Sequence, residues 1–515
     1  MNASNLCFKA AMLLLLAGML WGLQMAVADN HTAYPAHAHL NLIGFVALFL
    51  FGIFYRLNPA AEASWFAVPQ VWIWILSTIV MSIGVGLVHT GHKVGEPIAA
   101  VGSHSPAASV LAQGRAQADT SGGDGSQMKR STDRILTTHT GSLPRTAKVI
   151  ELLLAEQRNR GARKSELNAA VGEAIAHVVQ KQIESGIDII NDGEQGRTDY
   201  TVHVLDRLTG FAGESTPPLG TGDSEFPELA QLLEHFASPF QYRPACTSEV
   251  AWKDWIAAQA DIDLSKDVMN SANATELFMT SPSPGQIARY LKNRHYETEE
   301  AYVYALANVM KREYKAIVDA GFILQLDCPD LAMLRHTVYL DKSLSDFRKI
   351  IAVNVAALNH AVGEIPPDRM RMHVCWGSTV APHHTDVPLI DIIDIVLSGK
   401  PMAVSFPAAN ARHEHEWKIW RQVKLPAGKV IVPGVIDSTV NTVEHPEVVA
   451  DRILNFANVV GRENVIAGVD CGFGTFAGRV QVDTKIVWLK LQSLAEGARR
   501  ASAQLWAKGR SAEAG

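Results

Sequence analysis

The first 103 residues carry only six charged side chains, although 19% of the whole chain is charged. Three uncharged apolar stretches lie in this region, at residues 10–28, 39–55 and 71–88. Each is close to the ~20 residues that cross a bilayer core. The sequence therefore predicts an all-α membrane segment, residues 1–103, with about three transmembrane helices. The first stretch has a second interpretation as a signal peptide, because "AVA" before Asp29 resembles a cleavage site.

Residues 104–133 are rich in Ala, Ser and Gly and show no apolar period, which predicts a flexible linker. Met128 lies inside this linker and could begin an independent soluble protein. The net charge of −6 argues against nucleic acid as a partner. The five cysteines are odd in number and unevenly spaced, which favours a reducing compartment over a disulfide framework.

Strand-like and helix-like segments alternate over residues 134–505. The strand candidates are 134–142, 187–194, 322–330, 369–378, 401–410, 429–438 and 465–474, with one more expected between 240 and 282. Eight strands separated by helices predict an α/β fold, a parallel (β/α)₈ TIM barrel. Residues 205–275 form a long insertion after the second strand, and we expect it to act as a lid over the barrel mouth.

Residue types with catalytic chemistry follow the ends of several strands, where the active sites of such barrels lie. The strands end in "THTGS", "NDGEQGR", "QLDCPD", "HVCWGS" and "GVDCGFGT". In the fourth of these motifs, His373 and Cys375 alternate with apolar residues and therefore share one face of a strand. His-x-Cys is one half of a zinc site, although each residue alone could equally be a buried core side chain.

These five motifs, in this order, resemble the catalytic barrel of cobalamin-independent methionine synthase and its single-barrel relatives, over about residues 134–500. The uroporphyrinogen decarboxylases share this type of barrel. The resemblance implies Zn²⁺ held by His373, Cys375 and Cys471, and two thiolates with one imidazole suit that ion. It also implies a glutamate ligand, but this chain reads "SFPAAN", with Pro407 at that place. The ion would then keep three protein ligands and water, or take a fourth from His413, Glu414 or His415.

The reaction implied by the resemblance is zinc-dependent methyl or alkyl transfer to a homocysteine-like thiol. Glu194 and Asp327 would hold the substrate's ammonium group, and Gly141 and Ser142 would donate hydrogen bonds to its carboxylate. Strand alternation turns Cys328, next to Asp327, toward the core. Three further histidines are expected near the same rim, as a donor-side acid or as polar lining: His139, His383 and His384.

The methyl donor cannot be identified from the sequence. Two related activities stay open: a uroporphyrinogen decarboxylase-like reaction, which needs no zinc, and thiol alkylation of the epoxide and coenzyme M type. Residues 10–103 separately resemble a truncated membrane protein related to subunit I of haem-copper oxidases. That resemblance implies haem at His37 and His39, with the barrel as a passenger. The alternative for these histidines is a polar cap at the membrane interface.

The sequence makes conflicting predictions about the compartment. The N-terminal helices predict a membrane location, and Lys9 and Arg56 favour a cytoplasmic N-terminus. Three spans would then export the barrel. A zinc–thiolate site and the basic residues around position 130 favour the cytoplasm instead, and we expect the catalytic domain there. A reading frame that truly begins near Met128 would remove the conflict.

Overall fold

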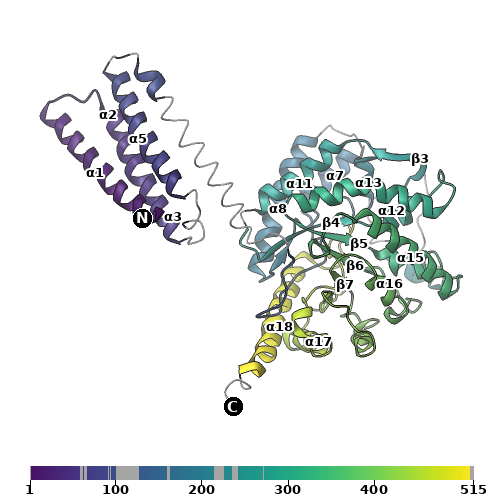
Figure 1. Ribbon diagram of the computed structural model, residues 1–515. Coiled ribbons are helices and arrows are strands. Elements are labelled where there is room, and N and C mark those ends of the chain that lie inside the picture. The colour runs from purple at the N-terminus through teal and green to yellow at the C-terminus, as the bar shows by residue number, and fades with distance from the viewer. Residues whose placement is uncertain are drawn as a thin grey trace. The chain divides into compact units, whose positions relative to one another are not determined.

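The structure is a computed structural model, and it describes residues 2–57, 62, 67–90, 92, 94–99, 127–158, 163–213, 225–234, 242–270 and 272–510 (Figure 1). It divides into an N-terminal unit, Met1–Gly125, and a C-terminal unit, Ser126–Gly515. Most of the predicted linker, residues 104–126, lies outside the described residues. The two units are therefore treated separately.

The N-terminal unit is helical, as predicted. Its elements are α1 (Ala3–Val27), α2 (Tyr34–His39), the π-helix η1 (Leu40–Ala47), α3 (Leu48–Leu57) and α5 (Ala67–His89). Three helical spans, Ala3–Val27, Tyr34–Arg56 and Ala67–His89, are long and apolar enough to cross a membrane. They contain the three predicted stretches except for Ala28, and each begins before the stretch that it matches. The outer face of α1 exposes large apolar side chains, including Leu13 at 68% and Leu23 at 61%. Such a surface suits lipid better than water, and membrane insertion stays a prediction.

Six strands of the C-terminal unit form one parallel sheet in the order β1-β4-β5-β6-β7-β8. Their bounds are β1 (Ile189–Ile190), β4 (Glu276–Pro282), β5 (Ile323–Asp327), β6 (Met370–His373), β7 (Ala403–Phe406) and β8 (Val430–Pro433). All five residues of β5 are buried, as are all four of β6, β7 and β8. The strand expected between 240 and 282 is β4.

The sheet curls because two short segments join its edges. Thr138 pairs in parallel with Ile189 of β1, and Thr137 pairs with Ala467. Val465 pairs in turn with Ile431 of β8. These segments belong to the first and last predicted strands. Their pairings connect the edge strand β1 to the edge strand β8. An α/β fold with a curled parallel sheet is therefore confirmed.

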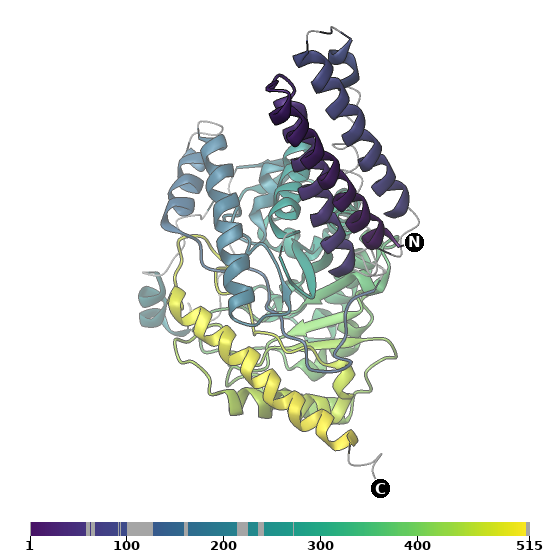
Figure 2. The same cartoon turned by 90° about the vertical axis from the view of Figure 1, so that its left-hand side faces the viewer.

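Helices surround this sheet. They are α7 (Ala147–Arg158), α8 (Lys164–Glu184), α12 (Pro284–Tyr290), α13 (Glu299–Asp319), α14 (Leu334–Thr337), α15 (Leu344–Ala361), α16 (Ile393–Leu397), α17 (Pro446–Val460) and α18 (Thr484–Arg510). Their starts follow local rules: Thr298 caps α13 by accepting a hydrogen bond from the N–H of Ala301. The long helix α18 runs along the outside of the unit, against α17 and α8 (Figure 2).

The predicted insertion has two parts. The strands β2 (Leu208–Ala212) and β3 (Ala245–Trp252) form an antiparallel pair, and α11 (Trp255–Met269) packs on the outer helices α8 and α13. The helix α10 (Pro227–Glu234) follows Glu225 and Phe226, which contact His384. Residues 214–224 and 235–241 lie outside the described residues. The role of this insertion as a lid stays a prediction.

Polar side chains occupy part of the interior of the curled sheet, and an apolar cluster occupies another part. Arg371 of β6 donates hydrogen bonds to Gln325 Oε1 at 2.7 Å, to Thr138 Oγ1 at 2.9 Å and to the His139 carbonyl at 2.9 Å. Its guanidinium carbon lies 3.5 Å from the centroid of the Phe278 ring. Burial lowers the pKa of Arg371 to about 9. The side chains at positions 138, 325 and 371 face the interior of the sheet. Because side chains alternate along a strand, those two residues further on, at 140, 327 and 373, face the same side.

Candidate active site

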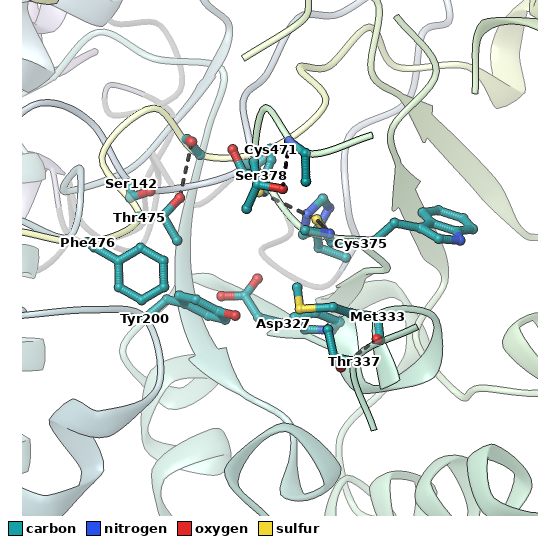
Figure 3. Close-up of a pocket in the computed structure, with 18 of the residues that line it drawn as sticks. Ser142, Tyr200, Asp327, Met333, Thr337, Cys375, Ser378, Cys471, Thr475 and Phe476 are labelled. Atoms are coloured by element: carbon teal, nitrogen blue, oxygen red, sulfur yellow. Dashed lines mark hydrogen bonds between the residues drawn. The ribbon is translucent and has the colours of Figure 1, made fainter. Parts of the chain in front are cut away.

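A cavity of about 240 Å³ lies where the parallel strands end. Side chains from several strand-end segments line it, and Figure 3 shows Asp327 between the rings of Tyr200 and Phe476 and the Cys375–Cys471 pair in that view. The lining residues discussed below are Thr140, Ser142, Glu194, Tyr200, Arg289, Tyr290, Asp327, His336, Thr337, His373, Cys375, His383, His384, Cys471, Phe476 and Arg479.

His373, Cys375 and Cys471 form the one group of three metal-ligating side chains found among the described residues. Their ligand atoms all lie within 4.8 Å of one another, and the two sulfur atoms are 3.6 Å apart. His373 ends β6, and Cys375 follows two residues later. Cys471 follows the segment that bridges to β8. The three predicted ligands therefore meet, although they are up to 98 residues apart in the chain.

The contacts around this group suit a metal. His373 Nδ1 lies 3.1 Å from Ser405 Oγ, and His373 Nε2 is buried without a hydrogen-bond partner. Ligating histidines commonly have one nitrogen fixed in this way while the other binds the ion. The hydrogen bond between the sulfurs raises the pKa of Cys375 and lowers that of Cys471, which the His373 ring lowers as well. Two sulfurs and an imidazole nitrogen fit Zn²⁺.

The sheet register places Pro407 next to this group. His373 pairs with Ser405 across β6 and β7, so continuing the register by two residues sets Cys375 beside Pro407. Alternation along the strand turns Pro407 to the same face as Ser405, whose hydroxyl contacts His373. Pro407 is buried there and has no ligand atom. The structure agrees with the expectation that a glutamate at this position would face the metal ligands.

His413 is not available as the fourth ligand, and that alternative is wrong for this residue. Its Nδ1 lies 2.9 Å from Glu416 Oε2 and its Nε2 lies 3.0 Å from Asp386 Oδ2. Both ring nitrogens are therefore occupied by carboxylates. Of the other two candidates, Glu414 pairs with Arg452 at 3.0 Å and His415 is exposed. Neither belongs to the metal-ligating group found among the described residues.

Asp386 collects three histidines at the cavity wall. Besides His413, it contacts His336 Nδ1 at 3.0 Å and His383 Nδ1 at 2.8 Å. His336 and His383 line the cavity. Burial acts to raise the pKa of Asp386, but the three histidines hold it well below its ordinary value. This carboxylate therefore stays ionised and orients the rings around it.

Glu194 and Asp327 both line the cavity, as predicted. Glu194 Oε1 accepts a hydrogen bond from Thr280 Oγ1 at 3.0 Å, whereas Oε2 is buried without a partner. Asp327 Oδ1 accepts from Gln325 Nε2 at 2.8 Å. Burial raises the pKa of each carboxyl group, although the charges of Arg197 and Arg145 oppose this at Glu194, and the charge of Glu194 raises the pKa of Asp327 further. Two buried carboxylates that repel each other in this way favour a cationic ligand.

Gly141 and Ser142 differ from the prediction in part. Ser142 lines the cavity, but the N–H of Gly141 already donates to His139 Nδ1 at 3.2 Å. The predicted donation from Gly141 to a substrate is therefore wrong in this structure. Gly141 instead leaves space: at its φ of +142°, an added Cβ would lie 2.6 Å from Glu194 Oε1. A side chain here would displace the Glu194 carboxylate.

His139 does not lie at the rim, which corrects its expected position. Thr138 faces the interior and Thr140 lines the cavity, so alternation turns His139 outward toward the helices. Its Nε2–H donates to Gln182 Oε1 of α8 at 2.7 Å, and burial lowers the pKa of the ring to about 3. The ring is therefore neutral and is absent from the cavity lining. His383 and His384 do line the cavity, as predicted.

Several cavity residues were not predicted. Tyr200, Arg289, His336 and Arg479 lie in loops or at helix ends, where periodicity carries no information about direction. The spacing of His383 and Asp386 in "HHTD" was the available signal for the histidine cluster. Cys328 is buried in the apolar core, as predicted.

The comparisons with known proteins concern the C-terminal unit. Residues 135–220 match the family model of the cobalamin-independent synthase catalytic domain. Methionine synthase from Saccharolobus solfataricus is 24% identical over 383 residues, which cover 73% of this chain and 98% of that protein. Methionine synthase from Thermococcus kodakarensis is 25% identical over 338 residues, which cover 65% of this chain and 84% of that protein.

A B12-independent methionine synthase from Shewanella sp. W3-18-1, solved in complex with selenomethionine, aligns with a TM-score of 0.54 and 20% identity, over 73% of this chain and 99% of that chain. This likeness supports the fold. The predicted resemblance to cobalamin-independent methionine synthases is confirmed, and these relatives agree with the predicted class of enzyme, a cobalamin-independent methyltransferase. The resemblance of residues 10–103 to haem-copper oxidases stays a prediction.

Proposed function

We propose that the C-terminal unit is a zinc-dependent (β/α)₈ barrel that transfers a methyl group to the thiol of homocysteine or a similar substrate. The observation that carries this proposal is the group formed by His373, Cys375 and Cys471, with one imidazole nitrogen buried and unpartnered. The relatives that match along nearly their whole length are named methionine synthases. Their name supports the choice of acceptor.

Bound zinc would supply a positive charge that holds the substrate thiol as a thiolate at neutral pH. The protein prepares the ligand atoms for this ion. Ser405 fixes the ring of His373, and the N–H of Gly377 donates to Cys375 Sγ at 3.2 Å. The thiol gives its proton to solvent or to a neighbouring base, and its sulfur then attacks the methyl carbon of the donor as the donor's bond to that carbon breaks.

Glu194 and Asp327 would hold the ammonium group of the substrate. Glu194 Oε2 needs a donor, and an ammonium group brings three. Its charge would also reduce the repulsion between the two carboxylates. The hydroxyl of Ser142, which lines the same cavity, would donate to the substrate carboxylate. His139 would contribute indirectly, because its ring holds the N–H of Gly141 and so shapes the turn beside Glu194.

The alternatives predict different behaviour. Thiol alkylation of the epoxide and coenzyme M type would use the same metal group but would not need the Glu194–Asp327 pair to bind an ammonium. A uroporphyrinogen decarboxylase-like reaction would need no metal, and the three converging ligands count against it. The side-chain arrangement therefore favours an amino-acid thiol as the acceptor.

Proton release tests the proposal. Homocysteine added to the zinc-loaded full chain in weak buffer should release about one proton per site, because a ligated thiol must lose its proton. Methionine, which has no thiol, is the matched control and should release none. Absence of zinc from the purified protein, or equal proton release with homocysteine and methionine, would overturn the proposal.

The N-terminal unit would attach this enzyme to a membrane through its three apolar helices, with the C-terminal unit in the cytoplasm. Haem at His37 and His39 is supported by the sequence resemblance alone. In the structure, His39 Nδ1 donates to the Pro35 carbonyl at 2.6 Å, and the ring of His37 contacts Asn41. Alkaline extraction of membranes from expressing cells tests the anchor. Full release of the chain would contradict it. An absorbance spectrum of the purified chain tests haem at His37 and His39.

A further inference from the structure

Two arginines line the cavity without a carboxylate partner among the described residues. Nε and Nη1 of Arg289 are buried without hydrogen bonds, and so is Nε of Arg479. Their remaining contacts are weak and uncharged: Arg289 Nη2 donates to Thr337 Oγ1 at 3.4 Å, and Arg479 Nη2 donates to Gln481 Oε1 at 3.3 Å. Both guanidinium groups therefore have donors left for another group.

Two of the four buried arginines among the described residues of this unit are paired with acids, whereas Arg197 and Arg371 donate hydrogen bonds to uncharged acceptors. Arg207 lies 2.8 Å from Glu313, and Arg243 lies 3.1 Å from Asp199. Burying a charged group without a partner is costly, so such groups are normally paired. Unlike all four of these, Arg289 and Arg479 keep buried N–H groups with no hydrogen-bond acceptor among the described residues, and an anion would supply one.

Asp330 does not fill that role for Arg289. The charge of Arg289 acts on Asp330, but hydrogen bonds from Ser283 at 2.7 Å and Asn354 at 2.9 Å already occupy that carboxylate. The structure has no ion pair between Asp330 and Arg289 within 4.0 Å among the described residues. None of the ion pairs found among the described residues involves Arg289 or Arg479, so an anion from outside the chain would suit this place.

Aromatic rings connect the two arginines. The guanidinium of Arg289 lies 4.9 Å from the centroid of Tyr290, and that of Arg479 lies 5.9 Å from the centroid of Phe476. Tyr200 contacts both rings edge-on, each with a centroid separation of 6.1 Å. The three rings thus form a row with an arginine at each end. Figure 3 shows the Tyr200–Phe476 part of this row beside Asp327.

We propose that Arg289 and Arg479 form a subsite for the anionic group of the second substrate, the alkyl donor. The anion is a carboxylate, sulfonate or phosphate, which the forked guanidinium donors match. The flat or apolar body of this molecule packs against Tyr200, Tyr290 and Phe476. The identification of this molecule as the donor rests on the proposed function, because the thiol substrate occupies the metal and carboxylate end. The binding of an anion does not rest on it.

Calorimetry on the full chain in detergent tests this subsite with simple probes. Benzoate, benzenesulfonate and phenylphosphate present the three anions on the same ring, and benzyl alcohol is their neutral counterpart. We expect at least one anion to bind about 10-fold or more tightly than benzyl alcohol, the equivalent of about 1.4 kcal/mol. The preferred anion then identifies the chemical class. Failure of all three to bind, or equal binding of benzyl alcohol, would overturn the proposal.

Variants locate the binding. Arg289→Gln and Arg479→Gln should each weaken the preferred anion about 10-fold. Arg421→Gln is the matched control, because Arg421 also lies over a ring, that of Trp417 at 4.7 Å, but is exposed and outside the cavity lining. Arg289→Lys should retain part of the binding and so distinguishes lost charge from lost folding.

Cys375→Ser separates the subsite from the metal. An anion held by the arginines should bind this variant as it binds the wild type, even if the proposed zinc chemistry is absent. An anion ligated to zinc would instead be lost in Cys375→Ser and retained in Arg289→Gln. That second pattern would overturn the subsite while leaving the proposed function intact.

Discussion

Two buried histidines of the C-terminal unit have the same burial and opposite surroundings. His373 and His413 are each 3% exposed. One nitrogen of His373 meets the hydroxyl of Ser405 and the other has no partner. Both nitrogens of His413 meet carboxylates. Although burial acts to lower it, Asp386 and Glu416 raise the pKa of His413 to about 9. The partners therefore decide whether a buried imidazole can ligate a metal or is held as a cation.

The largest effect that tests this contrast is on bound zinc. Cys375→Ser and Cys471→Ser should each lose most of the metal, a fall of at least about 100-fold in affinity, because each removes one of three ligands. His413→Gln should keep it. Metal analysis of the purified variants measures this, with circular dichroism as the check on folding. Full retention of zinc in both serine variants would show that the thiols are not ligands.

The same contrast applies to the carboxylates. Asp386 faces three imidazoles, whereas Glu194 Oε2 faces no donor. Glu194→Gln should therefore weaken homocysteine binding about 10- to 100-fold, the range expected for one charged hydrogen bond. Binding of 3-mercaptopropionate, which has the thiol and carboxylate but no amine, should change little. Equal losses for the two thiols would mean that Glu194 does not contact the ammonium.

Sequence reasoning succeeded where strand geometry determines direction. His373 ends the buried strand β6, Cys375 and Cys471 follow buried strand segments, and alternation correctly turned Cys328 away from the cavity. The same rule, applied from Thr138, would have turned His139 away as well. Alternation gave no information on the N–H of Gly141, because this group lies in a turn and donates a hydrogen bond to the ring of His139, two residues earlier.

The other end of the cavity was missed for a physical reason. Arg289 is the penultimate residue of the short helix α12, and Arg479 lies in a loop between the last strand segment and α18. Neither position belongs to a regular pattern of buried and exposed residues. Their significance depends on which acids are absent around them in space, and the sequence does not show that. The curled parallel sheet, in contrast, follows from repeated buried strands separated by helices.

Stability should depend on pH through His413. Its folded-state pKa of about 9 lies above the ordinary 6.5, so its contribution is complete below pH 6.5 and is lost as pH rises through 9. We expect the free energy of unfolding to fall by about 3 kcal/mol across this window. Denaturant unfolding at both ends of the window measures the difference.

Two histidine variants sharpen that measurement. His413→Gln should remove this part of the pH dependence. His360→Gln is the control, because His360 Nε2 meets the uncharged Asn308 side chain at 2.7 Å on the surface. A wild-type stability that stays constant between these pH values, or a slope that survives in His413→Gln, would contradict the cationic assignment.

The smallest effect concerns Pro407, which lies beside the metal-ligating group of His373 and could be replaced by a carboxylate like those that surround His413. Pro407→Glu would place a carboxylate opposite Cys375, on the face that Ser405 shares with His373. Since His413 is already committed to two carboxylates, it cannot compete for the ion, and the new side chain should serve as a fourth ligand. The gain should be about 10-fold in zinc affinity, because water can otherwise complete the coordination.

Pro407→Ala is the control for this change. It restores the backbone N–H that proline lacks without adding a ligand. Competition against a zinc chelator should therefore rank Pro407→Glu above both Pro407→Ala and the wild type, which should be similar. If glutamate and alanine retained zinc equally, the carboxylate would not reach the ion. The chain after β7 would then turn residue 407 away from the metal ligands, contrary to the register of β6 and β7. The ion would keep only three protein ligands, His373, Cys375 and Cys471.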